Sequence, residues 1–198
     1  MEARWLAALP PSRRERLLRL RERDDRTASL AGLALLLACA RAAGLPPPPL
    51  GSLHWPDAGK PAWPAGPDFS ISHGGGWVGC ALAVPRGRVG LDLEAAVAAR
   101  PEDLRLVQHA AEPPVAGGAR EATARWVAKE AALKAAGGSV GEARAVRVEP
   151  GCATFAGVRW RLERPALSPR IACAVACDVE AALAVTAEDA AALLDRGP

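Results

Sequence analysis

One stretch of the sequence, residues 124–138, constrains the fold more than any other. It reads A-R-W-V-A-K-E-A-A-L-K-A-A-G-G, is rich in alanine and lacks proline, which predicts a helix that ends at a glycine C-cap. On that helix Trp126, Glu130 and Lys134 are spaced four residues apart and share one face, whereas Lys129 lies off that face. Such a stripe can serve chemistry, or it can be a solvated Glu–Lys pair that adds roughly 0.2–0.5 kcal/mol.

The rest of the chain predicts an alternation of helices and sheets. Apolar periodicity predicts helices near residues 11–20, 27–43 and 188–194, strands at 69–71, 77–84 and 89–94, and a second group of strands at 145–148, 153–162 and 171–176. Proline and glycine make residues 50–67 and 95–118 less regular. This order predicts an α+β fold of two similar α/β lobes, residues 1–97 and 98–198, that meet near residues 94–101.

The charge is nearly balanced overall but unevenly distributed. Formal net charge is +3, yet seven arginines lie between Arg13 and Arg26. The acids Glu15, Glu22 and Asp24 interrupt this run, which argues against a simple nucleic-acid-binding arm. The arginines fit a smaller anionic ligand or partner, or a solvated helix face.

The cysteine pattern and the N-terminus indicate a reducing, cytoplasmic setting. Five scattered cysteines do not form the pattern of a disulfide framework, and the closest pair, Cys173 and Cys177, has no histidine near it for a zinc site. The N-terminus lacks the apolar core of a signal peptide. The longest apolar run, residues 30–40, is too short to span a bilayer.

Two carboxylates stand at alternate positions of one expected strand. In Asp92-Leu93-Glu94 both acidic side chains would point to the same side, because side chains two apart on a strand share a face. Two adjacent carboxylates repel each other, and a hard divalent ion such as Mg²⁺, which prefers oxygen ligands, removes that cost. Glu130 would add a third carboxylate. The alternative is a solvated strand face with no metal.

Two further stretches could bind an anion. In Ser70-Ile71-Ser72-His73-Gly74-Gly75-Gly76 a strand runs into a glycine turn, where backbone N–H groups, a hydroxyl and an imidazole can approach phosphate oxygens. In Gly59-Lys60-Pro61 a stiff turn holds a lysine. Taken singly, the glycine run can be only a turn, and Lys60 can be only solvated.

Taken together, these stretches resemble one enzyme family. The runs G-K-P, F-S-I-S-H-G, V-G-L-D-L-E and W-V-A-K-E-A-A-L-K-A-A-G occur in that order between residues 59 and 137, about two-fifths of the chain. They resemble the 4′-phosphopantetheinyl transferases, and in particular the larger, single-chain, pseudo-dimeric (Sfp-like) type.

The resemblance implies a reaction and its partners. Such an enzyme binds coenzyme A and Mg²⁺, or Mn²⁺, between its two lobes. It transfers the 4′-phosphopantetheine arm to a serine of an apo acyl or peptidyl carrier protein and releases adenosine 3′,5′-bisphosphate. The resemblance further implies a cytoplasmic monomer without a nucleic-acid or membrane partner.

The resemblance also implies roles for the acidic residues and for one lysine. Asp92, Glu94 and Glu130 match the metal ligands, and Lys134 matches a lysine that contacts the reacting phosphate. Glu130 and Lys134 are therefore the expected catalytic residues, with Glu130 acting as metal ligand, as general base or as both. Trp126 matches a tryptophan whose expected role is packing.

Coenzyme A binding is expected from residues in the first half of the chain together with Lys134. Lys60 and His73 match positions that contact the phosphates, and Ser72 accompanies His73. Arg26, in the run Asp25-Arg26, matches a contact to the nucleotide 3′-phosphate.

The sequence departs from the family pattern at the nucleotide end of the expected site. Ala28, Leu33 and Leu37 stand where the family commonly has basic residues. Arg21, Arg23 or Arg26 could therefore take over the phosphate contact.

The sequence is also compatible with two other functions. One is a catalytically weak relative that binds coenzyme A or a carrier protein in a regulatory role. The other is a nucleic-acid-binding module built on the arginine run, against which the near-neutral charge argues.

Overall fold

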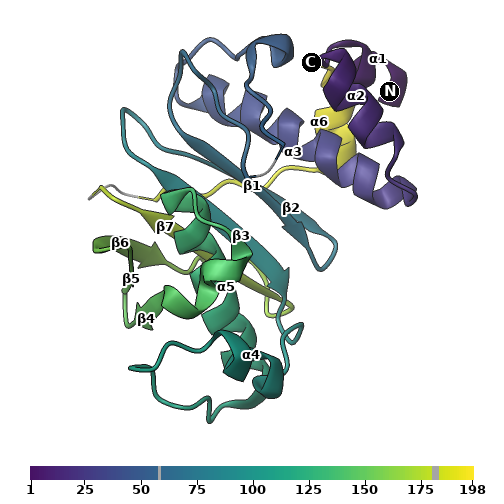
Figure 1. Cartoon of the computed structure of the whole chain (residues 1–198). Coiled ribbons are helices and arrows are strands. Elements are labelled where there is room, and N and C mark those ends of the chain that lie inside the picture. The colour runs from purple at the N-terminus through teal and green to yellow at the C-terminus, as the bar shows by residue number, and fades with distance from the viewer. Residues whose placement is uncertain (58, 180–182) are drawn as a thin grey trace.

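The computed structural model describes residues 1–57, 59–179 and 183–198, and their fold is α+β, as expected (Figure 1). The helices in this part of the chain are α1 Glu2–Ala7, α2 Pro11–Leu18, α3 Arg23–Ala42, α4 Pro101–Val107, α5 Gly118–Ala136 and α6 Ala190–Arg196, with short 3-10 helices η1 Leu50–Ser52 and η2 Val140–Ala145. The strands are β1 Phe69–Gly74, β2 Trp77–Leu82, β3 Val89–Ala95, β4 Arg147–Glu149, β5 Cys152–Phe155, β6 Val158–Glu163 and β7 Ile171–Cys177.

The first core is built from the N-terminal helices and the β1–β2 hairpin. The hairpin turns at Gly75 and Gly76, which both have positive φ angles that favour glycine. Helix α3 packs on the hairpin through an apolar face, and α1 and α2 cover α3. Helix α6 returns to this core at the other end of the chain, where the Trp5 indole N–H donates a hydrogen bond of 2.8 Å to the Leu194 carbonyl (Figure 1).

The larger sheet has five antiparallel strands in the order β3-β7-β6-β5-β4. The expected second group of strands is confirmed, but the expected strand 153–162 is two strands, because Ala156 and Gly157 adopt positive φ angles and form a tight turn. Strand β3, expected with the earlier strands, pairs with β7 in this sheet while also lying against β1.

Helix α5, the helix expected from residues 124–138, covers one face of this sheet (Figure 1). It ends at Gly137, whose φ of 76° is the left-handed C-cap that the glycine pair predicts. Its buried face is mostly alanine, so the helix axis lies close to the strands. The closest approach is at Gly90 of β3, where an added Cβ would lie 1.9 Å from the Ala131 carbonyl oxygen.

Two helices were not expected from the sequence. Helix α4 begins at Pro101, and this proline starts the helix instead of breaking it, because the first turn does not need its N–H group. Helix α1 is short and has a single fully buried side chain, Trp5, so it leaves little periodic signal. The remaining expected helices correspond to α2, α3 and α6.

The division into residues 1–97 and 98–198 remains a prediction, and several contacts cross it, among them the packing of α5 on β3. Strand β3 belongs to the first range but pairs with β7 of the second. Helix α6 belongs to the second range but packs on α3 of the first.

The cysteines and the apolar character of the helices were two further subjects of the sequence analysis above. All five cysteines are free thiols. Within the described residues, no helix combines the length and the apolar character needed to cross a bilayer.

The close contact at Gly90 gives a stability prediction. Gly90→Ala should lower the free energy of unfolding by about 3 kcal/mol, because the new methyl group meets the backbone of α5, which cannot move aside cheaply. Gly51→Ala is the control, since a Cβ there meets no atom within 4 Å, and its effect should stay within about 0.5 kcal/mol. Urea denaturation measures both, and equal stabilities for the two variants would contradict the contact.

Candidate functional site

A cavity of about 340 Å³ lies where β1, β3 and α5 meet. The two halves of the chain both contribute to its wall. Its lining residues are Ile71, Ser72, His73, Asp92, Glu94, Trp126, Glu130, Lys134 and Val140. The stripe expected on α5 is thus one wall of the cavity, and Lys129 is absent from it.

The strand geometry explains why the acidic side chains face α5. Val89, Leu91 and Leu93 point to the opposite face of β3, where they join an apolar cluster with β7. Asp92 and Glu94 therefore share the side of Gly90, which contacts α5. The prediction that the two carboxylates point into the same space is confirmed.

Asp92 is at the centre of the hydrogen bonds in the cavity, and it is only 4% exposed. Its Oδ1 accepts a hydrogen bond of 2.8 Å from the Ser72 hydroxyl and one of 2.6 Å from the Lys134 ammonium. The Lys134 Nζ also lies 3.3 Å from the Ser72 Oγ. The second oxygen, Oδ2, is buried and has no hydrogen-bond partner.

The two glutamates of the cavity hold their protons more tightly than exposed glutamates do. Burial raises the pKa of the Glu130 carboxyl; Lys134 opposes this shift, and Asp92 and Glu94 add to it. Burial and Asp92 also raise the pKa of Glu94, against the opposing charges of Lys134 and His73. The Glu130 Oε1 is buried and lacks a hydrogen-bond partner.

The donor set suits a hard divalent cation. Two buried carboxylate oxygens, Asp92 Oδ2 and Glu130 Oε1, have no donor, and Mg²⁺ prefers such oxygens. The arrangement is not a preformed metal centre, however, because no group of three His, Cys, Asp or Glu side chains in the described part of the chain is already placed to hold an ion. Instead, the Lys134 ammonium forms an ion pair with Asp92. Metal binding by Asp92, Glu94 and Glu130 therefore remains a prediction.

Two residues expected to bind coenzyme A do not line the cavity. Lys60 forms a 2.5 Å ion pair with Asp68 and donates to the Val89 carbonyl, which fixes a loop to the start of β3. Arg26 pairs with Glu2 at 3.1 Å and donates to the Leu20 carbonyl, which joins the N-terminal helices. Their role in binding stays a prediction. Ser72, His73 and Lys134 do line the cavity.

Two of the departures noted on α3, Leu33 and Leu37, are core residues. Leu33 and Leu37 are 1% and 3% exposed in the N-terminal core. A charged side chain at either position would be buried without water, so this face of α3 does not offer an anion contact.

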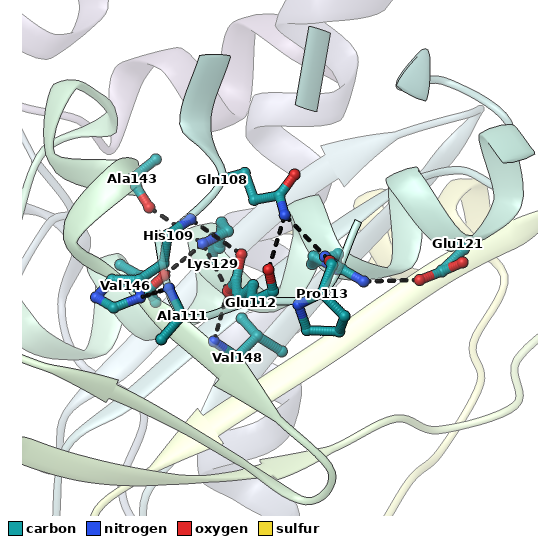
Figure 2. Close-up of polar contacts among 11 residues, drawn as sticks. Gln108, His109, Ala111, Glu112, Pro113, Glu121, Lys129, Ala143, Val146 and Val148 are labelled. Atoms are coloured by element: carbon teal, nitrogen blue, oxygen red, sulfur yellow. Dashed lines mark hydrogen bonds and ion pairs between the residues drawn. The ribbon is translucent and has the colours of Figure 1, made fainter. Parts of the chain in front are cut away.

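Lys129 has a structural role that the sequence did not reveal (Figure 2). It is fully buried and pairs with Glu112 at 2.9 Å, and it also donates to the Val146 and Ala143 carbonyls. Glu112 in turn accepts from the backbone N–H groups of Val148 and His109. The pair thus ties the segment between α4 and α5 to β4. Lys129, which lies off the face shared by Trp126, Glu130 and Lys134, is therefore a buried structural residue.

No sequence signal identified Glu112 as its partner. It lies 17 residues before Lys129, next to Pro113 and Pro114 in a segment without periodicity. Only the fold of this segment over α5 brings the two together.

Part of the chain is similar to a known protein. No protein-family model matches the chain. Over 96 residues it is 38% identical to a protein of Bacillus subtilis named 4′-phosphopantetheinyl transferase. The match spans 47% of this chain and 42% of that relative, less than half of each. It supports a relationship to this kind of transferase, and it leaves the activity, substrates and partners of the chain as proposals.

The buried pair gives a second stability prediction. Lys129→Met should cost about 3–5 kcal/mol, because it leaves the Glu112 carboxylate buried without its cation. Arg100→Gln is the control: its pair with Asp103 is exposed to solvent, so its loss should lower stability far less than the loss of Lys129. Urea denaturation measures both variants. Similar small losses would show that the Lys129 pair contributes no more than a surface pair.

The pKa of Glu130 predicts a pH dependence with a defined sign. When folding raises the pKa of a carboxyl, the protonated carboxyl favours the folded state at low pH. This contribution to the free energy of unfolding is lost as the pH rises from about 4.5 through the folded-state pKa. In metal-free buffer Glu130→Gln should therefore melt above the wild type at pH 7.5, and the gap should close as the pH falls below about 4.5.

Glu121 on the same helix is the matched control, with the opposite sign. Hydrogen bonds from the Gly117 and Ala116 backbone lower its pKa. Glu121→Gln should melt below the wild type at pH 7.5, and this gap should close as pH falls through the folded-state pKa of Glu121. Parallel pH profiles for the two variants would contradict the environment assigned to Glu130.

Proposed function

We propose that the chain is a 4′-phosphopantetheinyl transferase of the larger, pseudo-dimeric type. It would transfer the arm of coenzyme A to a serine of an apo acyl or peptidyl carrier protein and release adenosine 3′,5′-bisphosphate. The observation that carries the proposal is the meeting of Ser72, His73, Asp92, Glu130 and Lys134 in one cavity, although they come from three elements far apart in sequence. The partial match to a named transferase supports the same reaction.

The carboxylates would bind the metal that this reaction uses. Asp92, Glu94 and Glu130 would hold Mg²⁺, with Mn²⁺ as a substitute, and the unpartnered Asp92 Oδ2 and Glu130 Oε1 suit this role. The ion would supply positive charge to the pyrophosphate oxygens as the bond to the leaving phosphate breaks.

The chain's own residues account for the remaining steps. The serine hydroxyl of the carrier attacks the phosphorus atom, and its proton passes to a base. Glu130 is the proposed base, with the carboxylate oxygen that does not hold the metal as the proton acceptor, and burial raises its pKa above the ordinary glutamate value. Lys134 and His73, on opposite walls of the cavity, would bind the anionic oxygens.

The proposed reaction also defines the partners of the protein. Coenzyme A and an apo carrier protein are the proposed partners, without nucleic acid or membrane, and the protein would act as a cytoplasmic monomer. The cavity lies between β1 and α5, so both halves of the chain would hold the substrate, as in a pseudo-dimer.

A second function is favoured by one specific feature. Lys134 forms an ion pair with Asp92 at 2.6 Å, at the position expected for a metal ligand. A relative that binds coenzyme A or a carrier protein without transferring the arm would fit these facts.

A transfer assay separates the two. The protein is incubated with coenzyme A, Mg²⁺ and an apo carrier protein, and the carrier is weighed by mass spectrometry. A gain of one phosphopantetheine, lost with EDTA and restored by Mg²⁺, supports the transferase. Binding of coenzyme A without a mass gain supports the second function.

Asp92→Asn tests the role of the cavity in that assay. It keeps the shape of the side chain and an acceptor for Ser72 but removes the charge, so transfer should fall by about 10²-fold or more. Asp103→Asn is the control, because Asp103 is exposed outside the cavity and should leave transfer unchanged. Circular dichroism checks that both are folded. Full transfer by Asp92→Asn would remove Asp92 from the mechanism.

A further inference from the structure

Lys134 is in an unusual position for a residue that should bind a substrate phosphate. Its ammonium lies 2.6 Å from Asp92 Oδ1, and its other hydrogen-bond contact in the described structure is the Ser72 hydroxyl at 3.3 Å. The side chain is 27% exposed, whereas that of Asp92 is 5% exposed. Lys134 therefore reaches from the open part of the cavity to its buried floor.

The charges of the cavity explain this position. Three carboxylates, Asp92, Glu94 and Glu130, face one lysine, and burial makes uncompensated negative charge costly. Lys134 neutralises Asp92, while Glu130 Oε1 and Asp92 Oδ2 keep no partner. The site is short of positive charge even with Lys134 in place.

We propose that Lys134 is the counter-ion of Asp92 in the metal-free protein, and that a divalent cation replaces it there. Replacement frees the ammonium, on its flexible four-carbon stem, to turn toward the open part of the cavity. Metal binding would thus make the Lys134 ammonium available to bind the anionic substrate. The inference rests on the proposed function for the identity of that substrate, but the exchange of cations on Asp92 can be tested without it.

The exchange implies a coupling between the two ligands. While Lys134 stays on Asp92, it competes with the metal and is not available to a phosphate. A metal ion that releases it should strengthen binding of an anion, and by linkage the anion should strengthen binding of the metal.

The first experiment measures Mn²⁺ affinity without coenzyme A, by the electron paramagnetic resonance signal of free Mn²⁺. Lys134→Met keeps the length of the side chain but removes the competitor, so Mn²⁺ should bind about tenfold more tightly than to the wild type. Lys60→Met is the matched control: it removes an ammonium of similar burial that pairs with Asp68 outside the cavity, and Mn²⁺ affinity should not change.

The second experiment follows the ammonium itself in the wild-type protein. The chain has three lysines, and Lys129 is fully buried, so Lys134 and Lys60 are the lysines that a trace of an amine-reactive ester labels. Peptide mass spectrometry gives the labelling rate of each. Saturating Mg²⁺ should raise the Lys134 rate severalfold, with Lys60 as the internal reference. If Lys134 only repelled the metal ion from a distance, Lys134→Met would still bind Mn²⁺ more tightly. Mg²⁺ would then not raise the labelling rate of Lys134 in the wild-type protein.

The outcomes separate the inference from the function. Tighter Mn²⁺ binding by Lys134→Met together with faster Lys134 labelling in Mg²⁺ supports the exchange. Unchanged Mn²⁺ affinity, or a Lys134 labelling rate that Mg²⁺ leaves constant or lowers, overturns it, even if the transfer assay shows an active enzyme. Absence of transfer with a clear exchange would overturn the proposed function and leave the exchange intact.

Discussion

The close contact between α5 and β3 at Gly90 is the constraint on which the rest of the structure depends. Because Gly90 has no side chain, the backbone of the helix can rest almost directly on the strand. The alanine face of α5 extends this close contact along the sheet. Two residues further along β3, the same proximity brings Asp92 within reach of Lys134. Packing and chemistry are therefore set by one interface.

That interface also concentrates negative charge in a place with little water. Burial of the Asp92 and Glu130 carboxylates costs free energy, and the ion pair of Lys134 with Asp92 offsets part of that cost. The other buried lysine shows a different solution. Lys129 and Glu112 pair with each other, and four neighbouring backbone groups form further hydrogen bonds with them, so both charges are compensated. Adjacent residues of α5, Lys129 and Glu130, thus differ in whether their charge is fully compensated.

Sequence reasoning identified the parts of the site that follow from local periodicity. The strand period placed Asp92 and Glu94 together, and the helix period placed Trp126, Glu130 and Lys134 on one wall. It failed where the fold brings distant residues together. The Glu112–Lys129 pair, the pairing of β3 with β7 and the return of α6 depend on long-range contacts that leave no local pattern. The sequence indicated that Lys60 and the arginine run could bind an anion, and the resemblance placed Lys60 and Arg26 at the site. Their observed partners, Asp68 and Glu2, could not be predicted from spacing.

The return of α6 to the N-terminal helices affects the order in which the chain can fold during synthesis. Leu193 and Leu194 are part of the first core, and Trp5 finds its hydrogen-bond acceptor at Leu194. The helices that leave the ribosome first therefore cannot complete their core until residues 190–196 have followed. Until then the apolar surface of these helices stays partly uncovered and open to association with other chains.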